Sequence, residues 1–247
     1  EMQRSLVGSE MCIRDRSKGF DQFSSSGYET EIGRVREYMK DFAEITHIPA
    51  HLVPFEFPNT LEGLQQYDAV IISDVGANTF YLHHDTFYAG KATPNLPELI
   101  RQYVAEGGAL GMMGGYLTFM GIEAKGQWRN TPVEQALPVT MLPCDDRREH
   151  PEGIHAVLCA RDDAITHGLP QELPALFGYN ALTAKAQAKV LIHYESDPIL
   201  TVWEYGKGRS FAWASDCAPH WMPEEFCQSD CNRTLWSNVL RWAAKQI

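Results

Sequence analysis

The strongest constraint on the fold is the run Asp68–Val75 (DAVIISDV), in which successive apolar residues leave no polar face. A strand of this kind is covered on both sides, as in a parallel sheet between two layers of helices. A second such run, Ala109–Gly114 (ALGMMG), follows a segment, Pro97–Glu106, that is predicted to be helical and to stop at a Gly-Gly pair. This succession predicts an α/β fold with a doubly wound, mostly parallel sheet.

The flanking segments extend this pattern. Glu29–Ala43 has apolar residues at helical spacing, and Ile45–Ala50 is a short strand candidate. After residue 154 the connections become tight, and Gly206-Lys207-Gly208 is typical of a hairpin turn, so antiparallel strands are expected to extend the sheet. The three strands predicted there are Lys189–Tyr194, Ile199–Tyr205 and Arg209–Ser215. Asn232–Ala244 closes the chain as a helix.

The N-terminal segment, residues 1–16 (EMQRSLVGSEMCIRDR), has neither a helical nor a strand period. Its part SLVGSEMCIRDR resembles a translated sequencing-adaptor read, so we expect residues 1–16 to be non-native and residues 17–247 to form one domain. Ser17–Tyr28 would then be the loop after a missing first strand. The alternative is a genuine, weak strand around Ser5–Gly8.

Charge and composition exclude several classes of partner. The net charge is −11, with the acidic residues spread along the chain, which argues against nucleic-acid and anionic-membrane partners. No apolar run approaches the roughly 20 residues that span a bilayer. The six cysteines are too sparse for a disulfide scaffold, so reduced thiols in a cytoplasmic protein are expected.

Seven segments in order carry a family resemblance: SKGFD, YDAVIISDVGANTF, EGGALGMMGGYLTFMG, LPCDDRREHPEG, DAITHGLP, WEYGKGRSFAWASDCAPHW and LWSNVLRWAA. Together they resemble the class I glutamine amidotransferase-like superfamily, in its putative glutamine amidotransferase branch of bacterial cytoplasmic proteins, and are related to trehalose-utilisation-type domains. The resemblance implies a flavodoxin-like sheet of mostly parallel strands with antiparallel C-terminal strands.

The chemistry that the resemblance implies needs a cysteine that this chain lacks. A glutaminase of this fold carries Cys on a strand-to-helix elbow, in G-x-C-x-G, with a His base oriented by a carboxylate and two backbone N–H groups as an oxyanion hole. The matching strand end, Met112–Tyr116, has no Cys, Ser or Thr. Cys217 is the one candidate for a displaced nucleophile, although the adjacent Asp216 would raise its pKa.

Polar residues follow three predicted strands, and ligands on open α/β sheets bind at the carboxyl ends of strands. We predict His220 and Asp216 as an acid/base or ligand pair, and the alternative is that they cap a loop. For Asp74 and Asn78 the alternative is capping or turn formation, and for Gly114-Gly115 it is a simple turn. The predicted ligand contacts are Asp74, Asn78, Gly114, Gly115, Tyr116 and Trp221.

No metal or cofactor is predicted. Cys227-x3-Cys231 lacks the spacing of a structural zinc site. Asp145-Asp146-Arg147 with Glu149 fits an ion-pair cluster, a metal site or a solvated loop, and the solvated loop is the preferred interpretation.

The leading functional hypothesis is a protein that binds or transforms a small polar metabolite at the carboxyl edge of the sheet. The alternatives are a non-catalytic scaffold that oligomerises or binds a partner, and a glutaminase that uses Cys217. Whether the protein is an enzyme, and whether it forms a homo-oligomer, stay open at this point.

Overall fold

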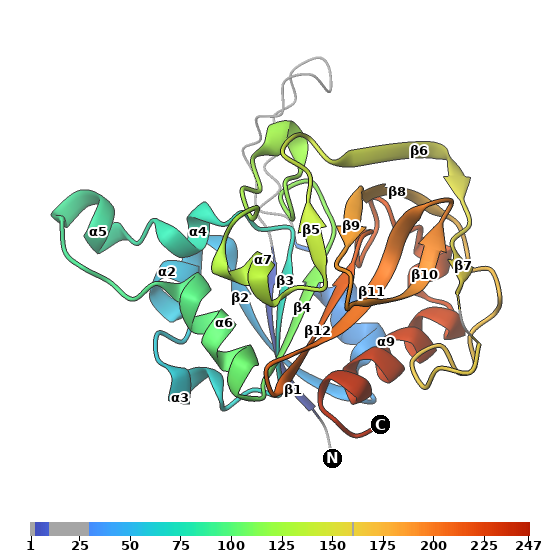
Figure 1. Cartoon of the computed structure of the whole chain (residues 1–247), viewed down its shortest axis with the longest axis horizontal. Coiled ribbons are helices and arrows are strands. Elements are labelled where there is room, and N and C mark those ends of the chain that lie inside the picture. The colour runs from blue at the N-terminus through green and yellow to red at the C-terminus, as the bar shows by residue number, and fades with distance from the viewer. Residues whose placement is uncertain (1–2, 10–29, 160) are drawn as a thin grey trace.

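A computed structural model describes residues 3–9, 30–159 and 161–247 (Figure 1). The predicted loop Ser17–Tyr28 lies outside the described residues. The centre of the fold is an eight-stranded sheet with the order β2-β1-β3-β4-β12-β11-β10-β7. Its strands are β1 (Gln3–Ser9), β2 (Ala43–Pro49), β3 (Ala69–Ser73), β4 (Ala109–Met113), β7 (Val157–Leu158), β10 (Lys189–Tyr194), β11 (Asp197–Tyr205) and β12 (Gly208–Trp213).

The first five strands of this order are parallel, and the last three are antiparallel. The parallel part has the strand order of flavodoxin-like, doubly wound sheets. The β11–β12 hairpin pairs Tyr205 with Gly208, and Gly206 has a φ of +61° that glycine adopts without strain. The predicted fold class and the predicted hairpin are therefore confirmed.

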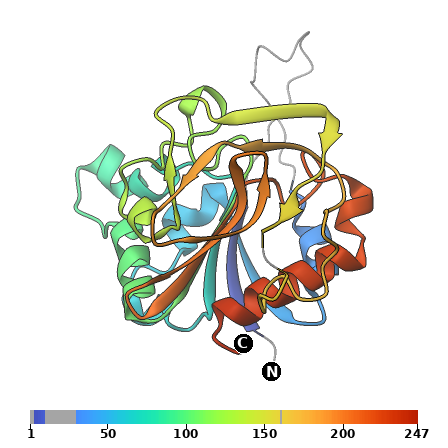
Figure 2. The same cartoon turned by 45° about the vertical axis from the view of Figure 1, so that its right-hand side comes forward.

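Helices cover both faces of the sheet. Helices α3 (Leu61–Leu64) and α6 (Leu96–Glu106) lie on one side, and α1 (Ile32–Met39) and α9 (Asp230–Ala243) lie on the other (Figures 1 and 2). Helix α6 begins where the side chain of Asn95 accepts the N–H of Glu98, and it ends at Gly107. Helix α1 is shorter than predicted, because Ala43 already belongs to β2.

The N-terminal strand β1 lies between β2 and β3, and Ser5 pairs with both Ile45 and Ala69. The alternative of a strand around Ser5–Gly8 is thus what the structure shows. The expectation that residues 1–16 are non-native concerns their origin, and it stays a prediction.

Two small antiparallel pairs lie beyond the main sheet. One is β5 (Val139–Met141) with β9 (Leu182–Ala184), and the other is β6 (Arg147–Ile154) with β8 (Leu176–Asn180). Strand β6 runs across the molecule above the carboxyl ends of the main strands (Figures 1 and 2). The preferred interpretation of residues 145–149 as a solvated loop is therefore wrong. Residues 147–149 belong to β6, and Asp146 is fully buried, where it accepts the N–H groups of Met120 and Gly121.

The remaining elements are short, and most of them escaped sequence prediction. They are η1 (Ala50–Leu52), α2 (Val53–Glu56), α4 (Asn78–Tyr81), α5 (His84–Ala89), η2 (Ile122–Ala124), α7 (Pro132–Ala136) and α8 (Glu224–Cys227). Within the described residues, no helix is both long and apolar enough to cross a membrane.

Candidate functional site

Three neighbouring strands, β3, β4 and β12, end at the same level of the sheet. Met113 at the end of β4 pairs with Ser73 of β3 on one side and with Trp213 of β12 on the other. Asp74 therefore emerges beside Gly114, and the turn that leads to Asp216 emerges on the far side of Gly114. The parallel register brings the predicted polar residues to one edge, as the sequence led us to expect.

The elbow after β4 has no room for a side chain. A Cβ at Gly114 would lie 2.2 Å from the carbonyl oxygen of Ala214. Gly115 has a φ of +152°, and a Cβ there would lie 2.5 Å from Oδ1 of Asp74. Both glycines are thus required by close packing between neighbouring strand ends, and a nucleophile at either position would force these strand ends apart.

The amide groups of the elbow are also already engaged. Gly114 donates its N–H to the carbonyl of Trp213 at 2.8 Å, and Gly115 donates its N–H to Oδ1 of Asn180 at 2.9 Å. The N–H of Leu117 donates to Oδ1 of Asp74 at 2.6 Å. An oxyanion hole requires N–H groups that point at the reacting oxygen. These three amides point at protein acceptors instead.

Asp74 has a structural role in addition to its place at the edge. Its φ of +50° lies in the left-handed region, which aspartate tolerates better than most residues. Its N–H donates to Oγ1 of Thr118 at 2.5 Å while its carboxylate accepts from Leu117, so Asp74 joins the end of β3 to the loop after β4. Asn78, by contrast, is exposed at the start of α4 and makes no side-chain hydrogen bond within the described part of the chain.

His220 and Asp216 contact each other, while their predicted role as an acid/base or ligand pair stays a prediction. Nδ1 of His220 lies 3.3 Å from Oδ2 of Asp216, whose Oδ1 accepts the N–H of Cys217 at 2.7 Å. Asp216 is 8% exposed, whereas the His220 side chain is 37% exposed. Burial acts to lower the pKa of His220, but the hydrogen bond and the charge of Asp216, with smaller contributions from Asp74 and Glu149, outweigh it and raise the pKa.

Aromatic rings enclose the imidazole of His220. The ring of Tyr116 meets it edge to face with centroids 4.3 Å apart, and the ring of Trp221 stacks on it at 5.2 Å. Trp221 is buried, so it supports His220 from behind. Glu149 joins the two rings, because it accepts the hydroxyl of Tyr116 and Nε1 of Trp221, each at 2.9 Å. We call Asp74, Tyr116, Glu149, Asp216 and His220 the edge cluster.

Strand β6 supplies the charged residues on this side of the edge cluster. Arg147 lies 4.7 Å above the ring centroid of Tyr116, and it forms ion pairs with Asp145 at 2.9 Å and Glu149 at 3.6 Å. Asp145, Arg147 and Glu149 thus form an ion-pair cluster, which was one of the interpretations that the sequence left open. Burial, together with the hydrogen bond to Glu149, raises the pKa of Tyr116 to about 12, so Tyr116 is a hydrogen-bond donor at neutral pH.

A buried pair, Asn180 and Asp146, supports the elbow from below. Besides accepting from Gly115, Asn180 donates Nδ2 to the carbonyl of Gly115 at 3.2 Å and to Oδ1 of Asp146 at 2.8 Å. Asp146 also accepts the N–H groups of Met120 and Gly121 at 2.9 Å and 2.8 Å. Sequence reasoning missed Asn180 altogether, because its partner at the elbow lies 65 residues away.

Cys217 is poorly placed to act as a nucleophile. Its Sγ is buried, 3.4 Å from Oγ of Ser73. Burial, followed by the charge of Asp216, raises the pKa of its thiol far above the ordinary value, which disfavours the reactive thiolate. Among the described side chains there is also no group of three or more His, Cys, Asp or Glu arranged to hold a metal ion.

A mostly parallel sheet in this order defines an α/β protein of the flavodoxin-like, doubly wound kind. A family model described as a putative glutamine amidotransferase matches residues 6–245, and the chain belongs to this family.

Solved structures share the fold of this chain. Two cytoplasmic proteins of Salmonella typhimurium, STM3548 and STM1381, are 39% and 43% identical to the chain, and each comparison has a TM-score of 0.88 and covers 98% of this chain and 99% of the other. A putative ThuA-like protein from Bacteroides uniformis shares the fold at 12% identity, with a TM-score of 0.56 over 98% of this chain and 91% of its own. None of the curated proteins compared with the chain matches it.

Proposed function

We propose that the protein binds a small polar metabolite at the edge cluster and that His220 acts on it as an acid or base. The contact between Nδ1 of His220 and Asp216 carries this proposal. A carboxylate on Nδ1 orients the ring and leaves Nε2 as the nitrogen for a ligand, which is the arrangement of a histidine in general acid–base catalysis. The partial exposure of the ring gives a ligand access to it.

The charges around His220 favour a neutral or cationic ligand. Asp74, Glu149 and Asp216 all raise the pKa of His220, so each contributes negative potential at the ring. Arg147 is the nearby cation, and it is already paired with Asp145 and Glu149. An anionic ligand would meet net negative charge here, whereas hydroxyl and amino groups would find carboxylate acceptors.

The same geometry argues against acyl-enzyme chemistry, in spite of the family's description. No nucleophile stands at the elbow, Gly115 cannot carry one without a clash with Asp74, and the thiol of Cys217 is buried. The proposed chemistry is therefore proton transfer without a covalent intermediate on the protein. The cytoplasmic proteins at 39% and 43% identity support a cytoplasmic location as part of this proposal.

The test is a thermal-shift screen with neutral, cationic and anionic metabolites. A ligand at 100 times its Kd stabilises the folded state by about 2.7 kcal/mol, which for a chain of 247 residues corresponds to a rise in Tm of roughly 5–10 °C. We expect neutral or cationic hits whose shift falls sharply in His220→Gln and in Asp216→Asn.

The matched control is His167→Gln, which alters an exposed histidine outside the edge cluster. It should leave the shift unchanged. Hits that are exclusively anionic, or that survive both edge-cluster substitutions, would contradict the proposal.

A further inference from the structure

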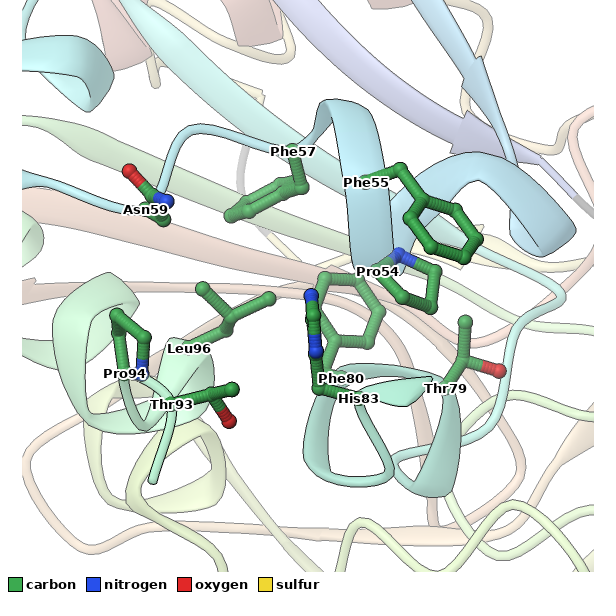
Figure 3. Close-up of a pocket in the computed structure, with 10 residues that line it drawn as sticks. All are labelled: Pro54, Phe55, Phe57, Asn59, Thr79, Phe80, His83, Thr93, Pro94 and Leu96. Atoms are coloured by element: carbon green, nitrogen blue, oxygen red, sulfur yellow. The ribbon is translucent and has the colours of Figure 1, made fainter. Parts of the chain in front are cut away.

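A cavity of about 170 Å³ lies between α2, α4 and the start of α6 (Figure 3). Rings and prolines make up most of its wall, and none of the lining residues belongs to the edge cluster. An apolar cavity of about 150 Å³ is large enough to hold one benzene molecule. By its size the cavity can therefore accept a single aromatic side chain, which would lie against these rings and beside the polar groups of Asn59, Thr79, His83 and Thr93. Its lining residues are Pro54, Phe55, Phe57, Asn59, Thr79, Phe80, His83, Thr93, Pro94 and Leu96.

An arm with exposed aromatic residues projects next to this cavity. It comprises residues 82–91, with α5 at its centre, and we call it the aromatic arm. Phe87 is 64% exposed and Tyr88 is 75% exposed, and α5 has no buried residue. Figure 1 shows α5 at the periphery, far from the sheet. Local hydrogen bonds hold the helix together, because His83 accepts the N–H of Asp85 and Gly90 ends it in the left-handed conformation.

The cavity and the aromatic arm form one continuous surface. Phe55 lines the cavity, is 65% exposed, and lies with its ring 6.0 Å from that of His83 and 6.5 Å from that of His84. The ring of His84 in turn lies 5.0 Å from that of Tyr88. Contiguous apolar patches on single-chain proteins are small unless they bind something. One chain thus presents both exposed rings and a hollow of ring size on the same surface.

Charge identifies where two copies of the chain can approach each other. With a net charge of −11, two copies repel over most of their surfaces. On the aromatic arm the charges of Asp85 and Lys91 lie 3.9 Å apart and offset each other. The arm is therefore a nearly neutral, apolar region on an acidic protein, where a second copy meets little repulsion.

We propose that the aromatic arm docks on a second copy of this chain about a two-fold axis, with Phe87 or Tyr88 of each copy entering the cavity of the other. A two-fold interface needs a patch that complements itself, and an exposed ring beside a ring-sized hollow meets that requirement. This proposal does not involve the edge cluster and goes beyond the function proposed above.

The area involved predicts a weak dimer. Aromatic side chains bury about 150–250 Å² each. At the exposures of Phe55, Phe87 and Tyr88, a symmetric pair would remove about 800 Å² from water before neighbouring residues are counted. Specific interfaces start at roughly 1,000 Å². The dimer should therefore depend on concentration, with dissociation in the micromolar range, roughly 1–100 μM.

The test is sedimentation velocity on the full chain from about 1 to 200 μM, a range that brackets the micromolar dissociation expected for a small interface. The wild-type protein should pass from monomer to dimer. The double variant Phe87→Ser/Tyr88→Ser should raise Kd tenfold or more without changing Tm, because α5 contributes nothing to the core. Thr79→Trp, which places a ring in the cavity, should weaken the dimer likewise.

Phe177→Ser is the matched control, because Phe177 is an exposed aromatic residue of β8, outside the arm and the cavity wall. It should leave Kd unchanged. Added salt should strengthen the dimer, because it screens repulsion between acidic copies. A wild-type chain that stays monomeric throughout the range, an arm variant that dimerises normally, or a Thr79→Trp variant with unchanged Kd would each overturn the proposal.

Discussion

Replacing Asp146 with alanine should strongly destabilise the protein. The carboxylate is fully buried, and it accepts hydrogen bonds from the N–H groups of Met120 and Gly121 and from Nδ2 of Asn180. Alanine leaves these three donors without an acceptor, at about 1–3 kcal/mol for each buried donor. Relief of the buried charge offsets part of this loss, since burial raises the pKa of Asp146. We expect the free energy of unfolding to fall by about 3–5 kcal/mol.

Asp145→Ala is the matched control, one residue away. The side chain of Asp145 is 33% exposed and pairs with Arg147 at the surface. Surface ion pairs contribute about 0–1 kcal/mol, and Asp145 also accepts the N–H groups of Glu123 and Arg147, which water can reach once the side chain is removed, so this substitution should cost about 2 kcal/mol or less. The two neighbouring aspartates thus differ about two-fold or more in expected effect, although both are the same residue type.

Urea unfolding of both variants at pH 7 measures the difference. Asp146→Ala should also perturb the aromatic signals of Tyr116 and Trp221, because Asn180 holds the peptide group of Gly115 immediately before Tyr116. If Asp146→Ala lies within about 0.5 kcal/mol of the wild-type protein, within the range of an ordinary surface substitution, the buried network does not support the elbow. The same conclusion would follow if Asp145→Ala were equally destabilising.

Three further predictions concern the elbow, the histidine and the buried thiol. Gly115→Ala should lower the free energy of unfolding by about 2–4 kcal/mol in urea, because it combines an unfavourable φ with a steric clash. Gly33→Ala, in the open first turn of α1, is the control and should be neutral or stabilising by about 0.5 kcal/mol. Asp216→Asn should lower the pKa of His220 in an NMR titration. Since the pKa of His220 is raised in the native protein, the stability that the pair contributes is present in full below the ordinary imidazole pKa of 6.5 and is lost as the pH rises through the native pKa. Equal pH dependence of stability in the wild-type protein and the variant would contradict the pairing. Cys217 should react with a thiol reagent only after unfolding, and the folded protein should release no ammonia from glutamine; ammonia release that Cys217→Ala abolishes would refute our account of the elbow.

The fold was accessible from sequence because its central strands are marked by local composition. Apolar residues on both faces of Asp68–Val75 and Ala109–Gly114 require a sheet buried between layers, and β3 and β4 lie within two residues of the predicted bounds. Short elements such as α5 and β8 were missed, since four to six residues carry too little periodicity to identify them.

Part of the candidate site was accessible for the same local reason. Asp216 and His220 lie four residues apart at the end of one strand, so their pairing depends on a single turn of chain. The absence of a nucleophile after β4 was likewise visible in the residues themselves. Sequence alone did not show that Asp74 occupies the space where a side chain of residue 115 would point.

The amino-acid sequence by itself determined the class of the protein: alternating buried strands and helices, polar residues at strand ends, and an elbow without a Cys, Ser or Thr. Only the tertiary structure decided which polar residues belong to the edge cluster. Glu149 lies on β6, which crosses above the sheet, and it is separated in sequence from its partners Tyr116 and Trp221 by 33 and 72 residues. It also distinguished buried Asp146 from partly exposed Asp145. Local patterns select secondary structure, whereas the burial and pairing of a charge depend on contacts between distant parts of the chain.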